Sequence, residues 1–177
     1  MVVATAFLIG LAVVDDKEYG TILAIRASPV NSTEYFVGRS IFPFLVTLFY
    51  TFAALVVLGL THVNTLQVYL VVIVAFSVTP LCGLLIGALG NNQVEAIGIG
   101  KILSVVLMLA ILGSTMLPDE WHWVVWWSPL YWIYDALEKV FTETAAWGSL
   151  AIDMAAAFCL TAAYFVLLRK RIVKGLA

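Results

Sequence analysis

The sequence predicts an all-α protein, a polytopic transmembrane helical bundle, and three observations support this fold class. First, 63% of the 177 residues are hydrophobic and 11% are charged, whereas soluble domains have about 45–50% and about 25%. Second, four apolar stretches reach about 20 residues, the helical length that crosses a hydrocarbon layer of about 30 Å. Third, no alternating ten-residue pattern predicts a barrel, and helices satisfy their own backbone hydrogen bonds in lipid.

The predicted helices follow one another along the chain. Residues 1–14 are too few for a complete span and lack a basic leader region and a small-residue cleavage site, so we expect a partial span and not a signal peptide. Complete spans are predicted at residues 41–60, 68–89, 96–117 and 149–168. Pro80 removes the backbone hydrogen bond to the carbonyl of Phe76, which predicts a kink in the second of these spans. Two glycine pairs inside the spans are interpreted as helix-packing positions, with a dimer-specific role as the alternative: Gly83 with Gly87, and Gly98 with Gly100.

The positions of the basic residues predict the orientation, because cytoplasmic loops of membrane proteins carry an excess of Lys and Arg. Eight of the nine basic residues lie in or next to one set of polar segments: Lys17, Arg26, Arg39, Lys101, Arg169, Lys170, Arg171 and Lys174. Lys139 alone belongs to the other set. We therefore expect segment 15–40 and the tail 169–177 in the cytoplasm, and the loops near 61–66 and 118–147 outside.

Segment 15–40 is a polar stretch between apolar runs, with a helical pattern on each side of a break. Its first half has four residues at helical spacing, which predicts a short amphipathic helix: Tyr19, Ile22, Leu23 and Arg26. This helix should end before Pro29, because the residue preceding a proline is pushed out of helical geometry. Asn31 and Glu34 resemble a capping box that starts a second helix entering the membrane. The segment is interpreted either as a helical elbow or as a solvated loop whose charges set the topology.

Segment 118–147 contains all six Trp residues of the chain, and Trp and Tyr concentrate at the membrane surface. Ser128 and Pro129 predict the start of a helix, with Ser128 as its cap. One face of that helix is apolar and the other polar: Leu130, Ile133, Tyr134, Leu137 and Phe141 against Asp135, Glu138 and Thr142. We expect two short re-entrant helices in the outer leaflet. They form either a plain interfacial belt or a lid over a substrate exit that includes Trp127 and Tyr131.

Asp153 is the acidic residue that enters a predicted span, just after its outer end. Close to the membrane surface, its carboxylate could snorkel to water at little cost. Deeper in the membrane and facing the bundle, the same carboxylate would mark a transport pathway. The sequence leaves both interpretations open.

Several classes of function lack a supporting pattern. No GxxxxGK[ST] phosphate-binding sequence occurs, so ATP would have to bind another chain, and no cofactor is expected on this one. His62 and His122 are far apart, while Cys82 and Cys159 lie in apolar spans, so no metal site is expected. The net charge of −2 and the scattered basic residues do not suggest a nucleic-acid partner.

One motif of segment 15–40 points to a family. Asp16-x-Glu18-x-Gly20-Thr21, followed by Pro29 and then by a helix with a basic edge, resembles the ABC-2 type permeases, the membrane subunits of ABC exporters. In that family the corresponding amphipathic helix docks on the ATPase subunit. The resemblance implies ATPase coupling through these residues: Asp16, Glu18, Tyr19, Gly20, Thr21, Ile22, Leu23 and Pro29. It also implies that the acidic pair faces basic residues of the partner.

The resemblance extends over nearly the whole chain. Leu117-Pro118, the WSPLY stretch from Trp127 to Tyr131 and the short helices before the last span look like the same family. Members of the family have six spans. The resemblance therefore implies that the first helix and the outer half of the second are absent here, and that residues 1–14 correspond to the inner part of the second.

The function implied by the resemblance is that of a permease subunit of an ATP-binding cassette exporter in the plasma (inner) membrane, with no enzymatic activity of its own. ATP and Mg would bind separate ATPase subunits, and two permeases would pair as a homodimer or heterodimer. A drug, lipid, peptide or glycan could be the cargo, since a fold does not specify its substrate. Two alternatives are a non-transporting membrane anchor or assembly factor, and a membrane-embedded hydrolase using Ser128, His122 and Asp119. The hydrolase lacks the glycines of a nucleophile elbow.

Overall fold

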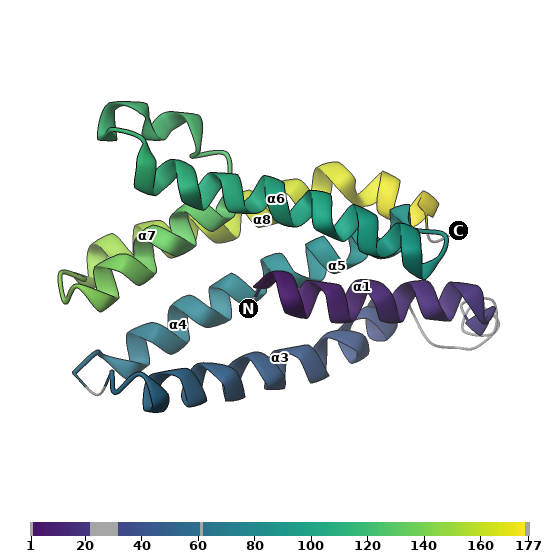
Figure 1. Cartoon of the computed structure of the whole chain (residues 1–177), viewed down its shortest axis with the longest axis horizontal. Coiled ribbons are helices and arrows are strands. Elements are labelled where there is room, and N and C mark those ends of the chain that lie inside the picture. The colour runs from purple at the N-terminus through teal and green to yellow at the C-terminus, as the bar shows by residue number, and fades with distance from the viewer. Residues whose placement is uncertain (1, 22–31, 61, 176–177) are drawn as a thin grey trace.

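The structure is a computed structural model that describes residues 2–21, 32–60 and 62–175, and its elements in these ranges are all helices (Figure 1). With the labels of Figure 1 they are α1 (Val2–Glu18), α3 (Ser32–Val57), α4 (Thr65–Phe76), α5 (Val78–Leu89), α6 (Gln93–Met116), the 3₁₀ helix η1 (Asp119–Val124), α7 (Pro129–Phe141) and α8 (Trp147–Gly175). The all-α architecture predicted from the sequence is confirmed.

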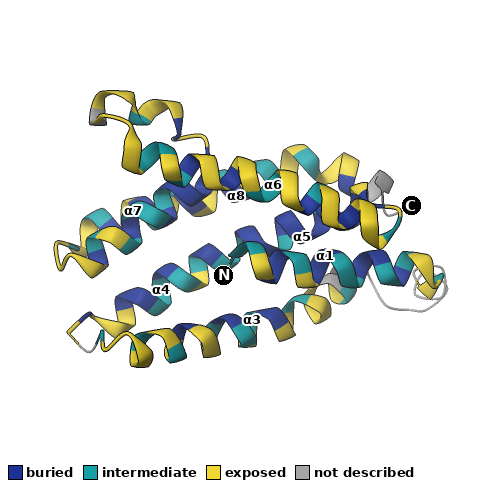
Figure 2. Ribbon diagram, in the orientation of Figure 1, coloured by how far each residue is buried: buried dark blue, intermediate teal, exposed yellow. Residues whose placement is uncertain are grey.

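Four helical stretches are long and apolar enough to cross a membrane: Val37–Val57, Thr65–Leu89, Gln93–Met116 and Trp147–Ile172. They overlap the four predicted spans, with ends displaced by a few residues. The second stretch is the central one, because 56% of its most apolar part is buried, against 22% in each of the other three. Figure 2 shows exposed residues along the outer sides of α3 and α6, as expected for helices that face lipid.

The second span is interrupted where Pro80 predicted a kink. Helix α4 ends at Phe76, α5 begins at Val78, and Ser77 lies between them. Pro80 has no N–H with which to bond the carbonyl of Phe76, so the regular ladder breaks there. Ser77 caps the end of α4, with its backbone N–H and its hydroxyl both donating to the carbonyl of Val74, at 3.0 and 2.7 Å.

Helices α1 and α5 pack closely because glycines interlock with branched side chains of the facing helix. A Cβ atom added at any of three glycines would collide with the opposite helix: Gly10 with Ile86 at 2.7 Å, Gly83 with Ile9 at 2.7 Å, and Gly87 with Val13 at 2.6 Å. The packing role predicted for Gly83 and Gly87 is therefore confirmed.

For the second glycine pair, the predicted packing role holds for Gly100 and not for Gly98. A Cβ atom on Gly100 would collide with the ring of Phe7 on α1, so Gly100 is a packing position as predicted. A Cβ atom on Gly98 would meet nothing within 4 Å, and Gly98 is exposed. The prediction for Gly98 is wrong, because two residues along a helix turn the side-chain direction by about 200° and move Gly98 to the other face.

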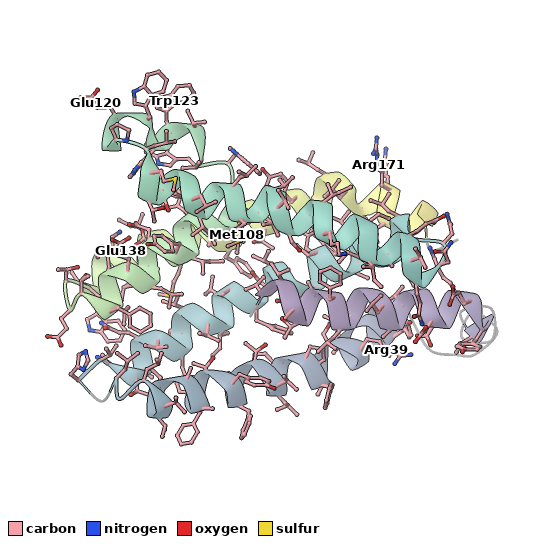
Figure 3. All side chains as sticks on the ribbon, in the orientation of Figure 1. Arg39, Met108, Glu120, Trp123, Glu138 and Arg171 are labelled. Atoms are coloured by element: carbon pink, nitrogen blue, oxygen red, sulfur yellow. The ribbon has the colours of Figure 1, made fainter. Side chains whose placement is uncertain are left out.

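The loops gather at two ends of the bundle (Figure 1). One end, here called the basic end, holds the C-terminal ends of α1 and α8 and the α5–α6 turn. The other, the tryptophan end, holds the α3–α4 turn, η1 and the α7–α8 turn. Figure 3 shows Arg39 and Arg171 toward the first end, and Trp123 and Glu138 toward the second. This division matches the grouping of loops predicted from the basic residues.

Replacing Gly83 tests the close packing of α1 on α5. We expect Gly83→Ala to destabilise the protein by about 1–3 kcal/mol, the usual cost of inserting a methyl group into a filled space. Gly98→Ala is the matched control and should be neutral or slightly stabilising, because alanine favours helix and the site is open. Thermal unfolding in detergent measures both, and equal midpoints for the two variants would contradict the packing described here.

Candidate functional site

The last turn of α1 carries four consecutive charged residues, 15–18, that reach three other helices at the basic end. We call this cluster the α1 junction, and define it as Asp15, Asp16, Lys17 and Glu18 with their partners Tyr35, Arg39, Ala88, Gly90 and Gln93. Consecutive residues on a helix point about 100° apart. A run of four charges can therefore reach neighbours on several sides at once.

Asp16 connects α1 to α3. Its side chain is nearly buried and accepts hydrogen bonds from the Tyr35 hydroxyl and from the Arg39 guanidinium, whose Nε lies 3.1 Å away. Arg39 also lies over the Tyr35 ring, 5.8 Å from its centroid. Burial, together with the hydrogen bond to Asp16, raises the pKa of Tyr35 to about 12. The phenol therefore stays neutral at physiological pH and keeps its proton to donate.

Lys17 connects α1 to α5. Its Nζ donates to the carbonyls of Gly90 at 3.1 Å and Ala88 at 3.4 Å. These carbonyls belong to the C-terminal end of α5, where unpaired oxygens and the helix dipole both favour a cation. Burial lowers the pKa of Lys17 from its ordinary value.

Asp15 and Glu18 connect α1 to the start of α6. The side-chain amide of Gln93 donates to Asp15, and the backbone N–H of Gln93 donates to Glu18 at 3.3 Å. Gln93 is the first residue of α6, so its N–H has no partner within that helix. Negative charge is also favourable at the positive end of the α6 dipole.

The chain leaves α1 immediately after the junction. Gly20 has a φ of +69° and its N–H donates to the carbonyl of Lys17 at 3.1 Å, as in a glycine-terminated helix. Tyr19 is 83% exposed and Thr21 is also exposed. The other three predicted coupling residues, Ile22, Leu23 and Pro29, lie outside the described residues, as does most of the predicted amphipathic helix. The helix predicted after Asn31 is found as α3, which begins at Ser32.

The coupling role expected of Asp16 stays a prediction, and its carboxylate already has partners within this chain. Its carboxylate faces Tyr35 and Arg39 of this chain, whereas the resemblance implied that it would face basic residues of a partner. The two donors lie one helical turn apart on α3, a spacing that places them on one face. That spacing is visible in the sequence, but the sequence cannot say which acid that face meets.

Of the residues predicted for a pathway or lid, Tyr131 lies in α7, Trp127 just before it and Asp153 in α8; α7 packs against α4 and α8. At the start of α7, the carbonyl of Trp127 accepts a hydrogen bond from the Tyr164 hydroxyl at 2.8 Å. Tyr131 is buried, with its ring 5.4 Å edge-on to Trp132 and its hydroxyl 3.4 Å from Nδ1 of His122. Trp127 and Tyr131 are thus close in the chain and at the same end of α7.

Asp153 belongs to a different cluster, near the other end of α7. Its side chain is 4% exposed, and its carboxylate lies 2.6 Å from Nζ of Lys139, which also contacts Asp135 at 2.6 Å. The snorkelling interpretation of Asp153 is therefore wrong: the carboxylate meets an ammonium group of this chain and is shielded from water. The predicted residues Trp127, Tyr131 and Asp153 do not form one cluster.

Two further expectations for α7 need correction. Ser128 precedes Pro129 as predicted, but its hydroxyl makes no capping hydrogen bond and, among the described residues, has no hydrogen-bond partner. A serine–histidine hydrogen bond of the kind that hydrolysis uses is therefore not present between Ser128 and His122. The buried face of α7 includes Leu130 and Ile133 as predicted. It also includes Ala136 and Val140, so Phe141 lies on the other side of the helix and is exposed.

Replacing Asp16 tests the link between α1 and α3. We expect Asp16→Asn to lower the free energy of unfolding by about 1.5–3 kcal/mol, the usual worth of hydrogen bonds to charged groups. Asp15→Asn is the control and should cost less, because Asp15 is less buried and contacts an amide. Denaturant unfolding in detergent compares the two. Equal losses would show that the bonds to Arg39 and Tyr35 add nothing beyond a surface contact.

Comparison with known proteins finds one matching family model. A protein-family model described as "Fluoroquinolones export permease protein Rv2686c-like" matches residues 1–168. No curated protein matches the chain in a parallel search, and neither does a solved structure. The match covers nearly all of the 177 residues, including the α1 junction, α7 and most of α8. The chain therefore belongs to the Rv2686c-like family of fluoroquinolones export permeases.

Proposed function

We propose that this export permease is the ABC-2 type membrane subunit of an ABC exporter and moves its cargo with ATP hydrolysed by a separate subunit. The observation that carries the proposal is the α1 junction. It lies where the chain leaves α1 toward the predicted elbow, and it links that point to α3, α5 and α6.

The junction suits the transmission of a push from a cytoplasmic ATPase. A partner that displaces the elbow would pull on the end of α1 at Gly20. The bonds of Asp16, Lys17 and Glu18 would then pass that displacement to three helices together. A bundle packed as closely as α1 and α5 moves as a rigid body, because interiors of this kind transmit strain and do not deform smoothly.

The basic end would face the cytoplasm, in agreement with the excess of Lys and Arg there, and the tryptophan end would face outward. Helix α7 would then be re-entrant. The carbonyl of Trp127, just before α7, is bonded by Tyr164, which lies 17 residues after Trp147 on α8. This is about 25 Å along α8 from its outer end. Residues Leu130 and Ile133 of α7 also line a cavity of about 350 Å³ together with Thr47, from the middle of α3.

The cargo would be a drug of the fluoroquinolone class, which is the substrate that the family description prints. ATP and Mg would be held by the ATPase subunits and not by this chain. Two permeases, identical or different, would pair in the plasma membrane with two ATPases. The rival candidate is a membrane anchor that binds the ATPase without transporting anything, and the experiments below separate the two.

Tyr19 tests the docking of the ATPase. Its side chain is 83% exposed next to the junction, so Tyr19→Ala should leave folding unchanged. We expect the mutation to weaken association with the ATPase by about 2 kcal/mol or more, the loss typical of a buried aromatic anchor. Co-purification and titration in detergent measure this. Trp123→Ala, an exposed aromatic residue at the tryptophan end, is the matched control, and an equal loss there would contradict docking at the basic end.

Export itself needs a separate measurement. Cells that produce the chain with its ATPase should accumulate less of a fluoroquinolone than cells that produce the chain with an ATPase unable to hydrolyse ATP. This difference in drug accumulation should disappear when the cells are depleted of ATP. If the ATPase co-purifies but accumulation never changes, the anchor alternative is favoured over transport of this class of drug.

A further inference from the structure

Polar contacts join α7 to α8 at two places, one near each end of α7. Near its beginning, the carbonyl of Trp127 accepts the hydrogen bond from Tyr164. Near its other end, Lys139 contacts Asp153 at 2.6 Å. Tyr164 and Asp153 are 11 residues apart on α8, about 16 Å at 1.5 Å per residue. Apolar side chains of the two helices pack between these points, and the two polar contacts fix how α7 is aligned along α8.

Losing the ionic contact between Lys139 and Asp153 should cost more free energy than losing the hydrogen bond between Tyr164 and Trp127. The Asp153 side chain is 4% exposed, and a carboxylate held away from water needs a cation beside it. Between Arg39 and Arg169 the sequence contains two basic residues, Lys101 and Lys139. Lys101 is exposed on the first third of α6, toward the basic end. Lys139 is therefore the cation that Asp153 depends on.

Asp135 provides an internal comparison. It contacts the same Nζ of Lys139 at the same distance of 2.6 Å, but from one turn earlier on the same helix. Its side chain is 32% exposed, against 4% for Asp153. An i,i+4 pair can steady the lysine side chain, but it cannot attach α7 to another helix. The ionic part of the attachment of α7 to α8 at this end therefore depends on Asp153.

We propose that Asp153 is a positioning residue that holds the re-entrant helix α7 against α8 through Lys139, and that cargo release on the outer side requires this contact. The proposal rests on the proposed export function, because it assigns α7 to the outer end of the transport path. It replaces the alternatives of a snorkelling surface acid and of an acid that binds the cargo. Asp153 acts through Lys139 and need not touch the cargo.

The chain contains its own spectroscopic reporter for the position of α7. All six tryptophans lie between residues 121 and 147, in η1, the turn after it, α7 and the first residue of α8. Tryptophan emission and its quenching by iodide thus report on η1, α7 and the start of α8. Proteoliposomes containing the full chain and its ATPase allow this signal and fluoroquinolone export to be measured on the same sample.

Three variants test the proposal: Asp153→Asn, the control Asp135→Asn, and the exchange of Lys139→Asp with Asp153→Lys, which keeps the net charge of the cluster. We expect Asp153→Asn to increase iodide quenching and to lower the maximal export rate about tenfold or more, as a broken buried ion pair should. The KM for the drug should stay within about twofold, because the residue does not bind cargo. Asp135→Asn should resemble the wild type. The exchanged pair should recover most of the export rate and the normal quenching.

Several results would overturn this assignment. Equal effects of the Asp153 and Asp135 variants would remove the special role of the interhelical contact, and a raised KM with an unchanged maximal rate would instead make Asp153 a cargo ligand. If the exchanged pair does not fold, Asp153→Glu serves in its place and must retain export. Should the wild type export no fluoroquinolone, the proposed function fails, while iodide quenching still shows whether Asp153 positions α7.

Discussion

Helix α1 can lie directly against α5 because Gly10, Gly83 and Gly87 remove the side chains that would hold the two backbones apart. In lipid, helices gain little from the hydrophobic effect when they associate, so close van der Waals packing at small residues has to supply the attraction. This contact decides where the charged end of α1 lies. It brings Lys17 to the last carbonyls of α5, and it leaves Asp15 and Glu18 beside the first turn of α6.

The charged side chains near the apolar interior follow one physical rule. A charge removed from water is tolerated when an opposite charge or several hydrogen bonds replace its hydration. Asp16 follows the rule with Arg39 and Tyr35, and Asp153 follows it with Lys139. Each pair joins two helices, so the charges that are costly to bury also specify which helices are neighbours at each end of the bundle.

These two pairs lie at opposite ends of the bundle. At the basic end, α1 is attached to α3, α5 and α6. At the tryptophan end, α7 is attached to α8 by the carbonyl of Trp127 and by Lys139. Helix α7 also packs along α8 and α4, so these polar contacts add specificity to an apolar interface.

The four spans followed from the sequence to within a few residues at each end, because lipid imposes a length of about 20 residues on a span and a helix satisfies its own backbone. The break before Pro80, the glycine contact at Gly83 and the start of α7 at Pro129 were also predictable, since each depends on local geometry. The partners of Asp16 and Asp153 were not. Periodicity places a residue on a face of its helix, but which helix covers that face, and whether Gly98 meets anything at all, depends on how the separate spans pack together.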